Sequence, residues 1–117
     1  IILESSKDIY NYKNEAHVFG IDEAQFFDNE IIEISNKLAK SGKRVVVAGL
    51  DKDYKAKSFG PIRQLMIDAE YVSKVNAICM TCGDPASFTQ RTTTEKDLVV
   101  VGETDNYEAR CRNCFKP

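Results

Sequence analysis

The sequence of 117 residues lacks the features that mark membrane-bound, secreted and nucleic-acid-binding proteins. Its formal net charge is -2, so it has no basic surplus of the kind that displaces counterions from a nucleic-acid backbone. No apolar run approaches the roughly 20 residues that span a bilayer, and no secretory signal is visible at the N-terminus. These absences favour a cytoplasmic protein with no membrane partner and no nucleic-acid partner.

Histidine is nearly absent, and cysteine is scarce but paired. The one histidine, His17, is better explained as structural than as a ligand or a base. The cysteines form two Cys-x-x-Cys pairs, a spacing that predicts a tetrahedral zinc site. In a cytosolic protein such pairs are better interpreted as zinc thiolates than as disulfides. The four expected ligands of a structural zinc ion are Cys79, Cys82, Cys111 and Cys114.

The first two thirds of the chain have the pattern of an α/β domain. Residues 16–22 and 43–50 are apolar runs of strand length, and the second run is typical of a strand buried on both faces of a parallel sheet. Helices are expected over residues 7–12, 29–41 and 61–70, with Ser5, Ser6 and Asn29 as candidate N-caps and Gly42 closing the second. Residues 51–59 are too polar for a core and predict a loop.

The last third of the chain predicts short strands around the cysteines. A strand over residues 71–78 is expected to lead into the first cysteine pair. Shorter strands are expected over residues 87–90, 98–101 and 107–110. The sequence therefore predicts two domains, an α/β domain over residues 1–78 and a zinc-binding domain over residues 79–117.

Two adjacent acids, Asp22 and Glu23, follow the first apolar strand. Open parallel sheets place their ligands outside the carboxyl ends of strands, and P-loop proteins present a magnesium-holding carboxylate there. The plain alternative is a solvated loop and helix cap. The neighbouring Phe26 and Phe27 favour a site, because two consecutive aromatics are costly in a surface loop unless they line a pocket.

Four segments occur in an order that resembles the zinc-containing thymidine kinases of bacteria and of the animal cytosol. They are Gly20-Ile21-Asp22-Glu23-Ala24-Gln25-Phe26-Phe27, Ala48-Gly49-Leu50-Asp51, Phe59-Gly60-Pro61 and the two cysteine pairs. The resemblance covers about residues 19–115, and the separations between the segments match as well. It implies part of a parallel P-loop-type sheet followed by a small zinc-ribbon-like β subdomain that carries a lasso loop.

The resemblance also implies an activity and its partners. The family transfers the γ-phosphate of ATP to the 5'-hydroxyl of thymidine or deoxyuridine in nucleotide salvage for DNA synthesis. It uses a structural zinc ion and magnesium with ATP, assembles as homotetramers and has dTTP as a possible feedback inhibitor. The expected partners of this protein are therefore thymidine, ATP and further copies of itself.

Individual roles transfer to matching positions of this sequence. Glu23 matches the family's general base, and Asp22 matches the acid that helps to hold magnesium through water. Arg91 is a weaker candidate for a polar or phosphate contact. The positions that match residues around the nucleoside are Phe26, Leu50, Tyr54, Phe59, Thr89, Val100, Gly102 and Tyr107. Val100, Gly102 and Tyr107 fall in the lasso, whose base the zinc site would clamp.

One element of the family pattern is missing, because no Gly-Lys-Ser or Gly-Lys-Thr phosphate cradle occurs in the sequence. The β- and γ-phosphates of ATP would have no positioned partner without it. We therefore expect the first strand, the cradle and the following helix to lie before residue 1. We also expect the 117-residue piece alone to have little or no kinase activity.

Two other classes of protein share parts of this pattern. Paired cysteines also occur in nucleic-acid-binding zinc ribbons, although the acidic composition argues against that class. The acidic segment that includes Asp22 and Glu23 is similar to the corresponding motif of helicase-like ATPases. The sequence after Leu50 supplies no arginine-bearing motor motif, and that class would leave the cysteines unexplained.

Overall fold

The structure is a computed structural model that describes residues 5–92 and 106–117. Val100, Gly102 and the strand expected over residues 98–101 lie outside these ranges. The chain divides into two compact units, here named the α/β unit (Ile1–Asp51 and Phe59–Tyr71) and the cysteine unit (Lys52–Ser58 and Val72–Pro117). The expected domains over residues 1–78 and 79–117 stay a prediction. No helix of the described chain is long and apolar enough to cross a membrane.

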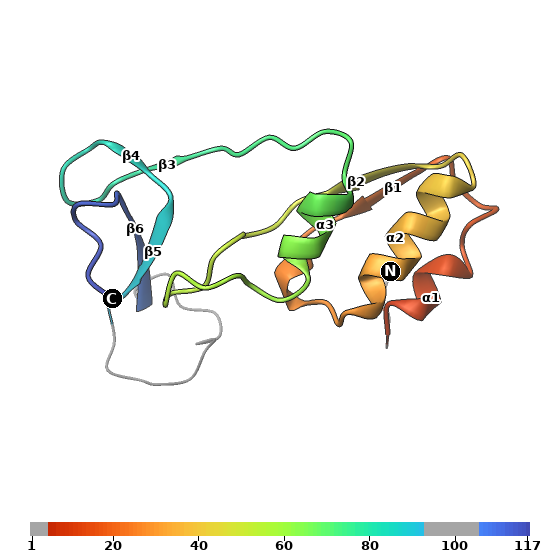
Figure 1. Cartoon of the computed structure of the whole chain (residues 1–117), viewed down its shortest axis with the longest axis horizontal. Helices are drawn as coiled ribbons and strands as arrows, with labels where there is room; N and C mark the ends of the chain where they lie inside the picture. Colours follow the sequence, from red (N-terminus) through yellow and green to blue (C-terminus); the bar gives the residue numbers. More distant parts are fainter. Residues whose placement is uncertain (1–4, 93–105) are drawn as a thin grey trace. The chain divides into compact units, whose positions relative to one another are not determined.

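The α/β unit is built on a strand, a helix and a strand in sequence. Strand β1 (Val18–Ile21) pairs in parallel with β2 (Arg44–Val47), and helix α2 (Glu30–Lys40) connects them (Figure 1). The register places Val18 opposite Arg44 and Ile21 opposite Val47. Parallel neighbours cannot be joined by a tight turn, so an intervening helix is the usual connection. The mixed α/β character and the parallel pairing expected from the sequence are confirmed.

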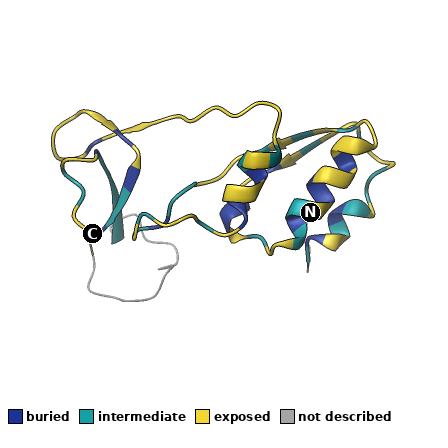
Figure 2. Ribbon diagram, in the orientation of Figure 1, coloured by how far each residue is buried: buried dark blue, intermediate teal, exposed yellow. Residues whose placement is uncertain are grey.

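One face of this two-stranded sheet packs against the helices. Alternate residues point to opposite faces of a strand, and Phe19, Ile21, Val45 and Val47 belong to the core face. Helix α3 (Ile62–Asp68) packs on the same core as α2. The fully formed core consists of Ile9, Ile21, Ala24, Ile31, Ile34, Leu38, Ile62 and Leu65. In Figure 2 the ribbon of α1, α2 and α3 carries dark blue stretches that mark buried residues.

The opposite face of the sheet is exposed. Val18 and Val46 retain 57% and 51% of their accessible surface. The expectation that residues 43–50 form a strand buried on both faces is therefore wrong for this chain. The reason is that the described helices supply only one covering layer, whereas burial on both faces requires two.

Helix α2 begins beside a short helix, α1 (Lys7–Tyr10). Asn29 occupies the N-cap position but its side chain makes no capping bond, and the carboxylate of Asp28 accepts the Glu30 N–H at 3.1 Å instead. The Ser6 hydroxyl donates to Asp28 Oδ1 at 2.6 Å, and this bond lowers the pKa of the Asp28 carboxyl. Ser6 therefore occupies the N-cap position of α1, but its hydroxyl bonds to the carboxylate that caps α2. This bond joins the two helices.

The segment after α3 differs from the expectation. Residues 71–76 form neither helix nor strand, and only Ala77–Ile78 (β3) is a strand. Tyr71 and Val75 are each 91% exposed. The apolar pattern alone is not sufficient for a strand, because a strand needs a partner for its N–H and C=O groups. None of the ladders formed by the described residues includes residues 71–76.

The cysteine unit consists of two small antiparallel ladders. Strand β3 pairs with β4 (Pro85–Ala86), and β5 (Phe88–Arg91) pairs with β6 (Tyr107–Arg110). The strands expected over residues 87–90 and 107–110 are confirmed. Residues 51–59 form a loop, as expected, closed by a bridge between Lys52 and Ser58. The buried cluster of this unit is small, with Cys79, Ala86 and Cys111 at its centre.

Candidate functional site

The four cysteines come together in the cysteine unit. Their sulfur atoms all lie within 4.8 Å of one another, and the Cys82 and Cys111 sulfurs are 3.7 Å apart. A tetrahedral zinc ion with bonds of about 2.3 Å would set its sulfur ligands about 3.8 Å apart. The donor set and the spacing therefore fit a four-thiolate zinc site. With four protein ligands, such a site is closed and structural.

Main-chain bonds shape both cysteine pairs into turns. Cys79 O accepts the Gly83 N–H at 2.9 Å, and Cys111 O accepts the Phe115 N–H at 2.9 Å. Burial raises the pKa of the Cys79 thiol, but nearby main-chain groups at Cys111, Cys82 and Thr81 outweigh this and bring its pKa to about 6. A hydrogen bond with Cys111 is the main cause that raises the pKa of Cys114 to about 12. Metal binding at this site therefore has to release thiol protons.

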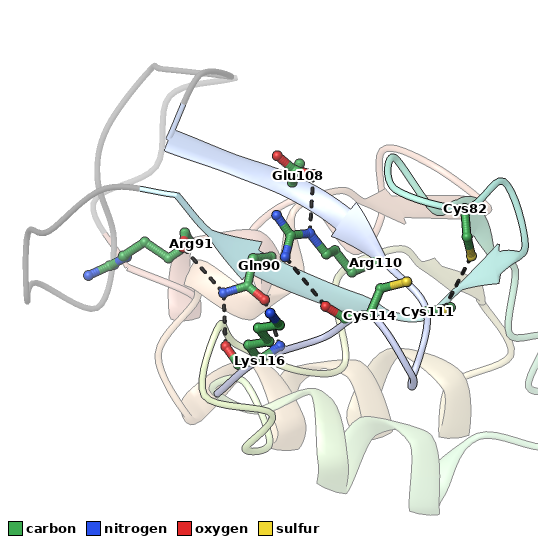
Figure 3. Close-up of polar contacts among 8 residues, drawn as sticks. All are labelled: Cys82, Gln90, Arg91, Glu108, Arg110, Cys111, Cys114 and Lys116. Atoms are coloured by element: carbon green, nitrogen blue, oxygen red, sulfur yellow. Dashed lines mark hydrogen bonds and ion pairs between the residues drawn. The ribbon is translucent and has the colours of Figure 1, made fainter.

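Side chains from both strands of the β5–β6 ladder support the second cysteine pair (Figure 3). Arg110 Nη1 donates to Cys114 O at 3.4 Å, and Arg110 Nε lies 3.2 Å from Glu108 Oε2. The Gln90 amide donates to Lys116 O and accepts the Lys116 N–H, at 2.9 and 2.8 Å. Gln90 thus pairs with the main chain of Lys116 as a strand residue would, which fixes the segment that follows Cys114.

Asp22 and Glu23 lie where β1 ends in the α/β unit. The pairing continues past the strands, because Ala48 N–H donates to Ile21 O and Ala24 N–H donates to Ala48 O, at 2.8 and 3.0 Å. The residues that follow β1 and β2 are therefore neighbours at the carboxyl edge of the parallel pair. This edge is the part of an open parallel sheet that binds ligands.

Glu23 has an unusual main-chain conformation. Its φ and ψ of 53° and 41° lie in the left-handed region, which non-glycine residues seldom adopt. Strain of this kind costs about 1–3 kcal/mol and is concentrated at functional sites. The Glu23 N–H donates to Asp22 Oδ1 at 2.9 Å, which helps to hold the turn. Both carboxylates are exposed, so a ligand can reach them.

Gln25 connects Glu23 to the chain after β2. Its Nε2 donates to Glu23 Oε2 at 3.2 Å, and its Oε1 accepts the Leu50 N–H at 3.0 Å. Gln25 is only 4% exposed, which is rare for glutamine. Nothing in the sequence predicts this role. The one signal that the sequence offers is the position of Gln25 two residues after Glu23, which does not reveal that its side chain is buried.

Apolar side chains lie on the same edge of the α/β unit. The rings of Phe26 and Phe59 meet edge to face, with centroids 5.5 Å apart and planes at 87°. Phe26 and Leu50 keep 54% and 49% of their surface exposed. Phe27, in contrast, packs against the core and does not line a site. Exposed apolar groups on the same edge as two carboxylates suit a ligand that has both an apolar surface and hydrogen-bond donors.

The remaining described positions of the predicted site lie in the cysteine unit. The Arg91 guanidinium stacks on the Tyr54 ring, with Cζ 3.7 Å from the ring centroid, and Arg91 Nη2 donates to the Tyr107 hydroxyl at 3.0 Å. Arg91 is only 8% exposed, so it organises these two rings. Thr89 is half-buried on β5, opposite Ala109. The Thr92 N–H donates to Asn106 O at 2.8 Å, which extends the β5–β6 pairing.

Comparison with known proteins matches almost the whole chain to one family. A family model described as "Thymidine kinase" matches residues 2–115. A thymidine kinase of Rhodothermus sp. (strain ITI 518) is 49% identical over 115 residues, which is 98% of this chain and 54% of the relative. Thymidine kinases of Bacteroides thetaiotaomicron and Bacteroides fragilis (strain YCH46) are 50% and 48% identical, over 97% of this chain and 57% of each relative.

The chain thus spans somewhat more than half the length of the curated relatives that it matches. The match includes the strand with both acids and both cysteine pairs, which are the two strongest signals in the sequence. The two other classes considered above each account for only one of them. The resemblance stated from the sequence is confirmed.

Proposed function

Because this chain belongs to the thymidine kinase family, we propose that the full-length protein transfers the γ-phosphate of ATP to the 5'-hydroxyl of thymidine or deoxyuridine. The observation that carries this proposal is the position of Glu23. An exposed carboxylate in a strained turn at the carboxyl edge of a parallel sheet is placed as a general base needs to be.

Glu23 accepts the proton of the 5'-hydroxyl as its oxygen attacks the γ-phosphorus. A new P–O bond forms while the bond from the γ-phosphorus to the bridging oxygen of the β-phosphate breaks, and ADP leaves with that electron pair. A carboxylate is effective in this role when it lies within hydrogen-bond reach of the hydroxyl. Glu23 Oε1 has no protein donor within residues 5–92 and 106–117, so it is the oxygen assigned to this proton.

Asp22 is assigned to magnesium, held through water. One of its oxygens, Oδ1, accepts the Glu23 N–H, and the exposed carboxylate leaves Oδ2 for a coordinated water molecule. Carboxylate oxygens are the ligands that magnesium prefers, so the residue fits the ion. When bound, magnesium supplies positive charge that offsets the charge developing on the phosphates.

The family resemblance assigns two sets of residues to the nucleoside. In the α/β unit, Phe26, Leu50 and Phe59 supply apolar surface that excludes water from the sugar and base. One methyl group in such surroundings is worth about 1–3 kcal/mol, so thymidine is preferred to deoxyuridine without being the only substrate. The second set consists of Tyr54, Thr89, Val100, Gly102 and Tyr107. Val100 and Gly102 lie outside the described residues and keep the lasso role that the resemblance implies.

The phosphates of ATP are bound by a Gly-Lys-Ser/Thr cradle outside these 117 residues, since the sequence contains none. That cradle belongs to a P-loop-type sheet of which β1 and β2 are a part. The sheet face that carries Val18 and Val46 is exposed in these 117 residues. A second layer from the rest of a P-loop-type domain can cover this face, as parallel sheets require. The isolated 117-residue piece accordingly has little or no kinase activity.

The remaining features of the protein follow the family. The four cysteines hold a structural zinc ion that fixes the chain on both sides of the lasso. The full-length protein acts in the cytoplasm as a homotetramer, takes part in nucleotide salvage and responds to dTTP as a feedback inhibitor. The family resemblance is what supports these last assignments.

The experiment that tests this function uses the full-length protein, thymidine and γ-labelled ATP. Substituting Glu23→Gln removes the base, so kcat should fall by about 10²–10⁴-fold while thymidine affinity is retained. The matched control is Glu33→Gln, which removes an exposed acid of α2 and should leave kcat unchanged. A Glu23→Gln enzyme with the kcat of the unsubstituted protein would remove Glu23 from the mechanism. Absence of thymidine phosphorylation by the unsubstituted full-length protein would overturn the function itself.

A further inference from the structure

We propose that Gln25 is a positioning residue, which orients the Glu23 carboxylate and ties it to the main chain that carries Leu50. Gln25 acts through these two neighbours and does not touch the substrate. The role rests on the proposed thymidine kinase activity, because it assumes that Glu23 is the general base.

The two hydrogen bonds of Gln25 fix the direction in which its amide points. The Leu50 N–H can only donate, so the amide oxygen has to face it, at 3.0 Å. The amide nitrogen then has to face Glu23 Oε2, at 3.2 Å. An ionised carboxylate can only accept, so this arrangement satisfies both partners. Turning the amide over would break both bonds at once.

Two glycines that are distant in the sequence, Gly49 and Gly60, lie against Gln25. A Cβ atom added to Gly49 would lie 2.8 Å from Gln25 Oε1, and one added to Gly60 would overlap the Gln25 carbonyl oxygen. Gly60 also has a φ of 55°. The segment before α3 thus approaches the Gln25 main chain more closely than a residue with a side chain allows. The segment after β2 lies directly against the end of the Gln25 side chain at Gly49.

The bond to Glu23 is the one that a purely structural residue does not need. Holding the Leu50 main chain requires only the amide oxygen. The amide nitrogen instead engages one oxygen of an exposed carboxylate, and in doing so it sets the direction of the other oxygen, Oε1. Fixed orientation of a catalytic group before the substrate arrives is a general source of rate enhancement. Gln25 therefore supports the rate of the chemical step.

Substitution of Gln25 in the full-length protein separates its two bonds. Gln25→Glu has nearly the same shape and keeps an oxygen for the Leu50 N–H, but it replaces the amide donor to Glu23 with a second carboxylate. We expect kcat to fall by about tenfold or more with the KM for thymidine within about twofold, because the base loses its donor and gains a like charge beside it. Gln25→Met removes both bonds, so kcat should fall and KM should rise as Leu50 shifts.

The matched control is Gln64→Glu on α3. The Gln64 Nε2 donates to Asp68 Oδ1 at 2.9 Å, so the substitution replaces an amide donor to a carboxylate in the same way, on an exposed surface. Both kinetic constants should stay as they are in the unsubstituted protein. A Gln25→Glu enzyme that keeps its kcat within twofold would overturn the proposal, provided that its urea midpoint is unchanged.

A double-substitution cycle keeps the proposal testable if Gln25→Glu is unstable. Gln25→Asn keeps the amide on a shorter side chain. We expect it to lower kcat in an enzyme that retains Glu23. In a Glu23→Gln background it should have little further effect, because its action passes through Glu23. Equal losses in both backgrounds would assign Gln25 a structural role and overturn the proposal. An unsubstituted protein without thymidine kinase activity would overturn the proposed function together with this role.

Discussion

Two residues with unusual main-chain conformations lie in or near the proposed substrate site. Within the described part of the chain, the non-glycine residues with positive φ are Glu23 and Ala56, at 53° and 62°. Glu23 is the proposed base, and Ala56 lies two residues from Tyr54 in the loop between Asp51 and Phe59. Such conformations cost about 1–3 kcal/mol each, so the surrounding hydrogen bonds have to hold them.

Gly60 provides a test at the scale of one residue. Substituting Gly60→Ala combines an unfavourable φ with a clash against the Gln25 carbonyl oxygen. We expect the free energy of unfolding of the full-length protein to fall by about 1–3 kcal/mol, and kcat to fall as Gln25 shifts. Denaturation in urea and steady-state kinetics measure the two effects.

Gly20→Ala is the control for this substitution. Gly20 lies in β1 with nothing within 4 Å of an added Cβ and without a positive φ. It should change stability by no more than about 0.5 kcal/mol. Equal effects of the two substitutions would mean that close approach to Gln25 is not what Gly60 provides.

At the scale of elements, the carboxylate that caps α2 also accepts a hydrogen bond from the residue before α1. Helix α1 has only four residues, too few to be stable alone, and it is held by Ile9 in the core and by Ser6 against Asp28. Asp28 also accepts the Glu30 N–H at the start of α2. One carboxylate therefore stabilises the start of α2 and the position of α1.

The Ser6 to Asp28 bond predicts a dependence of stability on pH. The bond lowers the Asp28 pKa below its ordinary value of 3.8, so the folded state favours the ionised carboxylate. This contribution is fully present above the unfolded pKa and is lost as pH falls through the lower folded pKa. Ser6→Ala should cost about 1 kcal/mol at pH 7 in chemical denaturation, and the difference should shrink below about pH 4.

Asn36→Ala is a suitable comparison, because it removes a hydrogen bond to another carboxylate, that of Asp68 on α3, without touching the cap. Its effect on unfolding should be small, since the pair is exposed. If the cost of Ser6→Ala were the same at pH 3 and pH 7, the carboxylate of Asp28 would not be the partner that matters.

The elements differ in how much of them the sequence predicts. β1, α2 and β2 could be predicted because their apolar spacing is local and matches the period of each element. Residues 71–78 have the same apolar pattern, yet most of them form no strand, because pairing depends on a partner and not on composition. Asn29 was expected to cap α2, but Asp28 does so because Ser6 orients its carboxylate.

The residues of the candidate site also differ in how far the sequence predicts them. The two cysteine pairs and the acids after β1 follow patterns that chemistry restricts to few uses, so the sequence alone predicts them as candidates. The structure brings the four cysteines together, and the role of the acids stays a prediction. Gln25 could not be identified in this way. Its burial depends on Gly49 and Gly60, which lie more than 20 residues along the chain, and their approach is a property of the fold.

At the scale of the whole molecule, the two units are stabilised by different means. The α/β unit buries a conventional apolar core, whereas the buried cluster of the cysteine unit consists mainly of cysteines. A unit with so little apolar core needs a metal or another cross-link to fold. We therefore expect the two units to respond differently when metal is removed.

A strong chelator added to the full-length protein should release about one zinc ion per chain. The helical circular dichroism signal should change little, because α1, α2 and α3 all belong to the α/β unit. Hydrogen exchange within residues 106–117 should accelerate sharply, and thymidine affinity should fall by about tenfold or more, equivalent to about 1.4 kcal/mol.

Cys111→Ser should have the same effects as the chelator, since it removes one of four ligands and no catalytic group. Thr81→Ser changes an exposed residue between Cys79 and Cys82 that is not a ligand, and it should keep both the metal and the affinity. Unchanged exchange and unchanged thymidine affinity after Cys111→Ser would show that the metal does not support the nucleoside site.

The shared carboxyl edge of β1 and β2 has a consequence for how substrate preference can change by mutation. Phe26 and Leu50 follow the strands and are each about half exposed, at 54% and 49%, whereas Ile21 and Val47 within the strands face the core. If these two side chains form the nucleoside surface proposed above, a substitution at either position changes that surface and leaves the buried core residues in place. Base selectivity could then change by mutation without compensating changes in the core.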